Sequence, residues 1–133
     1  MDGFVALRPE REHAPLNALA AACVRKFDTF RASLSDGELR RRRQSPLNER
    51  QERMLQRWGY PYVMECFRFH ITLTRRLEAD EIEPVMMHLR VYLAAALHEP
   101  QRVDGIALCH QPDARTPFRV VIRIPLQGGG AGW

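Results

Sequence analysis

Residues 67–74 (FRFHITLT) alternate apolar and polar side chains, and this alternation constrains the fold more than any other feature of the chain. A period of two is typical of a β-strand with one buried face. We therefore predict a strand over residues 62–74, with its apolar side chains packed beneath helices. The opposite face would carry Arg68, His70, Thr72 and Thr74.

Short apolar, β-prone runs predict three further strands, over residues 3–8, 105–110 and 118–126. Apolar residues recurring at steps of three and four predict helices, over about 15–30, 47–58 and 82–97. Ser35 and Glu38 have the spacing of a capping box, which predicts a short helix through Arg43. Gly59 is expected to end the helix before it.

This order of elements favours an α+β fold in which an antiparallel sheet has helices packed on one face. Residues 1–126 are expected to form a single domain, because 133 residues are enough for one core. Residues 127–133 are Gly-rich and are expected to form a flexible tail.

The composition bears on the surface charge and the cellular location of the protein but does not indicate a particular function. The net charge is +4, and arginine supplies nearly all of the positive charge, with Lys26 the single lysine. Guanidinium groups suit bidentate phosphate contacts, although an ordinary arginine-rich surface is the favoured interpretation. Three widely separated cysteines favour free thiols and a cytoplasmic location. No apolar run approaches the roughly 20 residues that span a bilayer, so no membrane association is expected.

The polar face of the strand over 62–74 carries a pattern that suits phosphodiester chemistry. His70 and Thr72 are two residues apart, so their Cα atoms lie about 7 Å apart on one face. Imidazole can transfer a proton near neutral pH, and a hydroxyl can donate to a phosphate oxygen. Arg68, on the same face, would add positive charge for substrate binding. A histidine on a strand is more often structural, so that alternative stays open.

The stretch FRFHITLT resembles the second His-x-Thr signature of the 2H phosphoesterase superfamily. More narrowly, GFVALRP, FRASLSDGELRRRR, RWGYPYVMECFRFHITLT and TPFRVVIRIPL resemble, in that order, the C-terminal half of its phosphonate-metabolism-associated family. The resemblance covers about residues 3–126 and implies one lobe of a bilobal fold, in which each lobe supplies one His-x-Thr or His-x-Ser strand. It implies that His70 is a catalytic acid or base and that Thr72 holds the phosphate. Tyr62, at the start of the predicted strand, is a further candidate for substrate binding.

The chain departs from that family pattern in one respect. It contains no second His-x-Thr or His-x-Ser, whereas acid–base cleavage of a phosphodiester ordinarily uses two proton-transfer groups. The sequence fits a half-length fragment, a natural single lobe that pairs with itself, or a degenerate relative. Because a lone lobe exposes the surface on which its missing half would dock, we predict a homodimer or a complex with a complementary lobe.

The function predicted from the sequence is therefore that of a phosphoesterase-like protein. It would act on a cyclic phosphate or phosphodiester related to phosphonate metabolism, and it is open whether the lone half is active. The alternatives are a non-catalytic module that binds nucleotides or RNA ends, and a half-domain that serves protein interaction. RNA is the less favoured partner, because no aromatic stacking platform is evident. Neither a metal nor an organic cofactor is expected.

Overall fold

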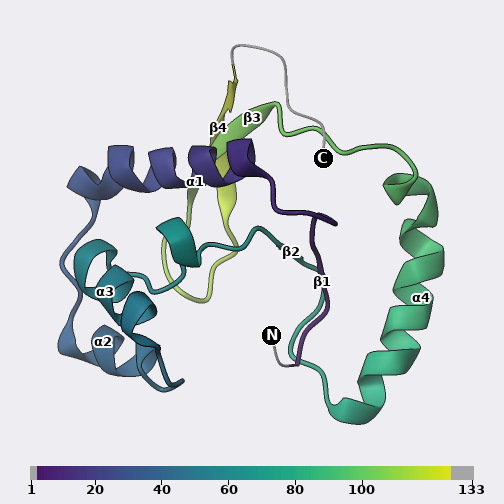
Figure 1. The fold of residues 1–133 in the computed structure, drawn as a ribbon, viewed down its shortest axis with the longest axis horizontal. Coiled ribbons are helices and arrows are strands. Elements are labelled where there is room, and N and C mark those ends of the chain that lie inside the picture. Colours follow the sequence, from purple (N-terminus) through teal and green to yellow (C-terminus); the bar gives the residue numbers. More distant parts are fainter. Residues whose placement is uncertain (1–2, 127–133) are drawn as a thin grey trace. The chain divides into compact units, whose positions relative to one another are not determined.

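The computed structural model describes residues 3–126 and divides the chain into two compact units, Met1–Ala79 and Asp80–Trp133 (Figure 1). Helices and short antiparallel strand pairs make up both units, so the predicted α+β class is confirmed. The strands do not form one sheet as expected: β1 pairs with β2, and β3 pairs separately with β4. The predicted flexible tail, residues 127–133, lies outside the described residues.

The first unit joins a minimal strand pair to three helices. The strands are β1 (Ala6–Leu7) and β2 (Ile71–Thr72), which run antiparallel with Ala6 opposite Thr72 and Leu7 opposite Ile71. The helices are α1 (Ala14–Phe27), α2 (Asp36–Arg42) and α3 (Glu49–Trp58). Two 3₁₀ turns, Asp28–Phe30 and Met64–Cys66, complete this unit.

The strand predicted over residues 62–74 is far shorter than its alternation suggested. Its first half is interrupted by the 3₁₀ turn Met64–Cys66, where Met64 has a φ of 52°. Its partner β1 is followed within two residues by Pro9, which has no N–H to continue a ladder. Arg68 and His70 therefore lie on extended chain before the paired residues, and only Thr72 of the predicted site is in the strand.

Side-chain caps define the helices where the sequence placed them. The Ser35 hydroxyl accepts from the Glu38 N–H, and the Ser35 N–H donates to the Glu38 carboxylate at 3.0 Å, so the predicted capping box forms. This backbone hydrogen bond, with a second one from the Ser35 hydroxyl, lowers the pKa of Glu38. Asn48 and Gln51 form an equivalent box at the start of α3. Helix α3 ends at Gly59, whose φ of 73° lies in the left-handed region.

The core of the first unit is small. Leu55 on α3 is 1% exposed, and three further apolar residues are buried, namely Leu16, Val63 and Leu77. Leu16 comes from the first turn of α1, and Leu77 follows β2, so buried apolar side chains occur both on the helices and beside the strand pair. The backbone bond from Leu77 N–H to Gly3 O extends the contact between the two chain segments.

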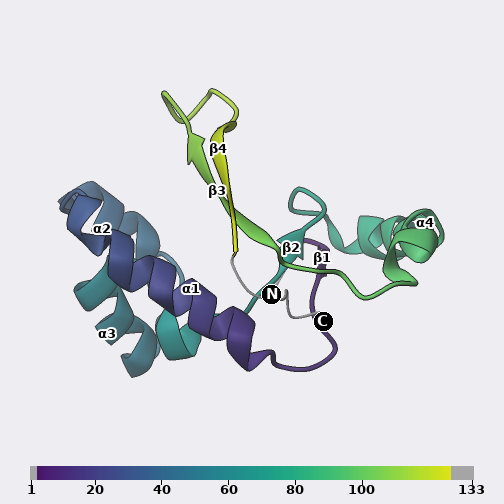
Figure 2. The ribbon, with the colours of Figure 1, turned by 90° about the horizontal axis from the view of Figure 1, so that it is seen from above.

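The second unit consists of α4 (Ala79–Leu97), which begins one residue before it, and the hairpin of β3 (Gly105–His110) and β4 (Arg119–Pro125). The paired residues of the hairpin run from Gly105 opposite Pro125 to His110 opposite Arg119. The register shifts between Leu108 and Cys109. Figure 2 shows it as an extended two-stranded ribbon.

Both elements of the second unit expose large apolar side chains. Val91 and Tyr92 on α4 are 81% and 75% exposed, and Phe118 beside β4 is 69% exposed. None of the helices in residues 3–126 combines the length and the apolar character that crossing a membrane requires.

Two glycines offer a matched test of this backbone. Gly59→Ala places a Cβ in the left-handed region and 3.0 Å from the Arg31 guanidinium, so we expect it to lower the free energy of unfolding by about 1 kcal/mol. A Cβ at Gly37, inside α2, would lie 3.9 Å from the Ser35 hydroxyl oxygen, an ordinary van der Waals contact, so we expect Gly37→Ala to be neutral or to stabilise by up to about 1 kcal/mol. Urea denaturation of both variants measures the difference; a destabilised Gly37→Ala beside an unaffected Gly59→Ala would contradict this backbone.

Candidate functional site

His70 is exposed, and one nitrogen of its ring, Nδ1, is engaged in a hydrogen bond. Its Nδ1 lies 2.9 Å from the carbonyl oxygen of Arg68. A carbonyl oxygen only accepts, so this hydrogen bond requires the proton on Nδ1. In the neutral ring, Nε2 then carries the lone pair and can accept a proton from a ligand or a water molecule.

Thr72 lies on the same face of the strand pair as the His70 ring. Thr72 is opposite Ala6, and the Phe4 ring, two residues before Ala6, lies 6.2 Å from the His70 ring. Because alternate residues share a face, Phe4, Ala6 and Thr72 point to the same side as His70. Thr72 is exposed, and within residues 3–126 its hydroxyl makes no hydrogen bond. It is therefore available to donate to a ligand oxygen.

Thr74 belongs to the predicted polar face but has a structural contact. Its Oγ1 accepts the Val5 N–H at 3.0 Å, in the position where a regular ladder would use a backbone carbonyl. The adjacent backbone bond, from Leu73 N–H to Val5 O, is 2.9 Å long. Thr74 thus extends the pairing of β1 and β2 beyond its two registered residue pairs.

Arg68 is anchored to its own segment of chain. Its Nη1 donates to the carbonyl oxygens of Glu65 and Phe67, at 3.0 and 2.7 Å. Its Nε lies 3.6 Å from a carboxylate oxygen of Glu12, which precedes α1. The arginine therefore links the His70 segment to the loop between β1 and α1.

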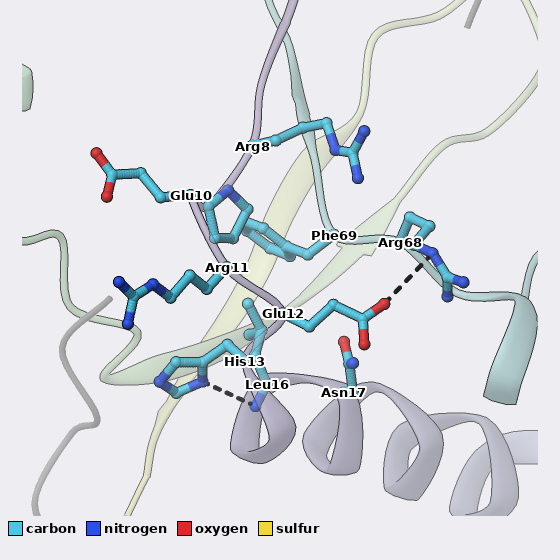
Figure 3. A pocket seen from close by; sticks show the side chains of 10 residues that line it. Arg8, Glu10, Arg11, Glu12, His13, Leu16, Asn17, Arg68 and Phe69 are labelled. Atoms are coloured by element: carbon cyan, nitrogen blue, oxygen red, sulfur yellow. Dashed lines mark hydrogen bonds and ion pairs between the residues drawn. The ribbon is translucent and has the colours of Figure 1, made fainter.

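A cavity of about 170 Å³ lies beside this link (Figure 3). Arg68 and Phe69 line one part of it, and the loop after β1 and the first turn of α1 supply the rest, namely Arg8, Pro9, Glu10, Arg11, Glu12, His13, Leu16 and Asn17. His70 and Thr72 do not line the cavity, so of the predicted site residues the structure brings only Arg68 to it.

His13 is a residue of this cavity that the sequence pattern did not single out. It is the N-cap of α1, and its Nδ1 accepts from the Leu16 N–H at 3.3 Å (Figure 3). The signal that could have identified the cavity is the charged run Arg8–His13 directly before a helix, interrupted only by Pro9.

Tyr62 lies outside the lining of the cavity, and its role in substrate binding stays a prediction. Its ring and the Tyr60 ring meet edge to face with the centroids 5.7 Å apart, and the Arg42 guanidinium lies 4.9 Å from the Tyr60 centroid. The turn Met64–Cys66 separates it from the His70 segment. Residues 3–126 contain no cluster of His, Cys, Asp and Glu that could hold a metal ion.

Comparison with known proteins gives one family and two curated relatives. The family described as "Protein of unknown function (DUF1045)" matches residues 1–119. The chain is 39% identical over 131 residues to "Ribose 1,5-bisphosphate phosphokinase PhnN" of Janthinobacterium sp. (strain Marseille), covering 96% of this chain and 29% of the relative. It is 35% identical over 120 residues to the protein of the same name from Laribacter hongkongensis (strain HLHK9), covering 90% and 27%.

The chain thus spans less than a third of the length of these two curated relatives. No solved structure matches the chain.

The two threonines of this segment allow a structural contact to be separated from a free hydroxyl. Thr74→Val removes the acceptor of the Val5 N–H, so we expect it to lower the free energy of unfolding by about 1–2 kcal/mol. Thr72→Val removes no hydrogen bond within the described chain, so we expect a change within about 0.5 kcal/mol. Thermal or urea unfolding of the pair measures both values, and equal losses would show that the Val5 contact does not stabilise the pairing.

Proposed function

Since this chain belongs to the family described as "Protein of unknown function (DUF1045)", we propose for it an activity that this description leaves open. The chain is one lobe of a cytoplasmic phosphoesterase. It acts on a cyclic phosphate or phosphodiester in phosphonate metabolism, with His70 as acid or base and Thr72 as phosphate ligand.

The observation that supports this proposal best is the hydrogen bond of His70 Nδ1, together with the exposed Thr72 hydroxyl on the same face. The bond from Nδ1 to the Arg68 carbonyl orients the ring and leaves Nε2 as the proton acceptor. The Thr72 hydroxyl, on the same face, is exposed and free of hydrogen bonds within residues 3–126. A proton acceptor beside a hydroxyl donor suits an ester whose phosphate oxygens accept from Thr72 while Nε2 takes a proton.

In the proposed hydrolysis, water adds to phosphorus and one P–O ester bond breaks. His70 Nε2 takes the proton of the attacking water, and a second group must give a proton to the leaving oxygen. The chain contains no second His-x-Thr or His-x-Ser, so that group comes from another copy or from a complementary lobe. The exposed apolar side chains of α4 and the β3–β4 hairpin support such an association.

The names of the curated relatives support phosphonate metabolism but give no support to esterase chemistry. Both relatives are named ribose 1,5-bisphosphate phosphokinase PhnN, and the sequence of this chain resembles a phosphonate-associated family. A phosphokinase holds nucleotide phosphates, typically with a glycine-rich loop ending in Gly-Lys-Ser/Thr. The single lysine of this chain, Lys26, stands between Arg25 and Phe27 and fits no such loop. We therefore propose no kinase activity for this chain.

Substitution of the proposed catalytic histidine tests the activity. We expect the protein to hydrolyse at least one of a panel of cyclic phosphates, and we expect His70→Ala to lower kcat about 10²–10⁴-fold, since this is the usual contribution of one acid–base group. His98→Ala, an equally drastic change at a side chain that is 84% exposed, is the matched control and should retain turnover. Equal turnover by wild type and His70→Ala would refute the assigned role, and wild type without turnover of any member would favour a binding module.

The oligomeric state tests the need for a second copy. We expect light scattering coupled to gel filtration to give twice the chain mass of 15.4 kDa at micromolar concentration, because the second unit leaves Val91, Tyr92 and Phe118 uncovered. The His70→Ala variant should have the same mass, since the exposed apolar side chains are unchanged. A monomer that persists as the concentration is raised would contradict the homodimer.

A further inference from the structure

Arg68 is fixed in place but one edge of its guanidinium group is unsatisfied. Nη1 is occupied by two backbone carbonyls, whereas Nε faces the Glu12 carboxylate at 3.6 Å, which is too long for an N–H···O hydrogen bond. Nε and Nη2 together form an edge that binds phosphate or carboxylate oxygens in pairs. Glu12 therefore neutralises this edge loosely without filling it.

Arg8 supplies a second guanidinium group to the same cavity. It directly follows β1, and continuing the register of Leu7 with Ile71 places it across from His70. Within residues 3–126 its side chain has neither an ion pair nor a hydrogen bond. In Figure 3, Arg8 and Arg68 point to the same side of the cavity as Glu12 and Asn17. This side combines two cations with one displaceable carboxylate.

The backbone N–H groups at the N-terminus of α1 are not the donors that would bind an anion in this cavity. The Leu16 N–H is bonded to His13 Nδ1, and the Asn17 N–H is bonded to the His13 carbonyl at 3.0 Å. Pro15 has no N–H. The donors that could face a ligand are thus the arginine side chains, which come from the loop after β1 and from the His70 segment.

We propose that this cavity is a subsite for a second anionic group of the substrate, a phosphate monoester, bound between Arg8 and Arg68 after it displaces Glu12. The proposal rests on the proposed function, because it identifies the substrate as a phosphate ester that carries another phosphate. Arg68 connects the proposed catalytic residue His70 to this cavity. Its carbonyl oxygen accepts from His70, and its side chain lines the cavity. Glu12 acts as an internal competitor that keeps the arginine edge neutral when no ligand is present.

Binding of inorganic phosphate to the full chain tests the subsite without any turnover. Phosphate is titrated at constant ionic strength while the backbone amides of residues 8–17 are followed by NMR. We expect Arg8→Gln to weaken binding about tenfold or more, because a charge-assisted contact is lost. We expect Glu12→Gln to tighten binding severalfold, because the competing carboxylate becomes neutral.

Two variants on α3 serve as matched controls. Arg50→Gln and Glu49→Gln change the net charge by the same amounts, but neither residue lines the cavity, so phosphate affinity should be unchanged. Unchanged affinity in Arg8→Gln would overturn the subsite, as would a weakening in Arg50→Gln equal to that in Arg8→Gln. Weaker rather than tighter binding by Glu12→Gln would overturn the role of Glu12.

A pair of substrates distinguishes a substrate subsite from a place for free phosphate. We expect adenosine 2′,3′-cyclic phosphate that also carries a 5′-phosphate to have a KM about tenfold lower than the same compound without it, and we expect Arg8→Gln to abolish this ratio. A ratio of one in wild type would overturn the subsite while leaving the esterase proposal intact. Conversely, undiminished turnover by His70→Ala would refute the esterase role, whatever the phosphate titration shows.

Discussion

The pairing of β1 with β2 is the interaction on which the candidate site depends. It joins Val5 to Thr74, which are 69 positions apart in the sequence, and it consists of only two registered residue pairs. The Leu73–Val5 backbone bond and the Thr74 side-chain bond lengthen it on one side. Without this pairing, the loop before α1 would not meet Arg68, and the cavity would have no second wall.

The helices could be predicted because their determinants are local. The capping boxes at Ser35 and Asn48 and the stop at Gly59 each depend on residues within one turn. The β3–β4 hairpin is nearly as local, and the Asp113 carboxylate fixes its turn by accepting from Thr116 and Arg115, which lowers the pKa of Asp113. A strand, by contrast, needs a partner, and alternation over 62–74 could not show that β1 is only two residues long.

Some features of the candidate site likewise depend on residues close in the sequence, whereas others depend on the fold. His70 and Thr72 are neighbours in the sequence, so their spacing suggested a shared face, whereas the approach of Arg8 and Glu12 to Arg68 comes only from the fold. Polar residues on this face also have structural contacts that the pattern did not distinguish from ligand contacts: Thr74 bonds to Val5, and Arg68 bonds to two carbonyls. Thr72 is the member of the set whose hydroxyl is free within the described chain, which is why the proposed chemistry centres on it and His70.

The most direct test of this account is the tautomer of the neutral His70 ring, observed by long-range ¹H–¹⁵N NMR with His70→Gln for assignment. We predict the proton on Nδ1 in the neutral ring, as the Arg68 carbonyl requires, and a change in the Nε2 signal when adenosine 3′-monophosphate is added. A proton on Nε2, together with signals that the nucleotide leaves unchanged, would contradict the account.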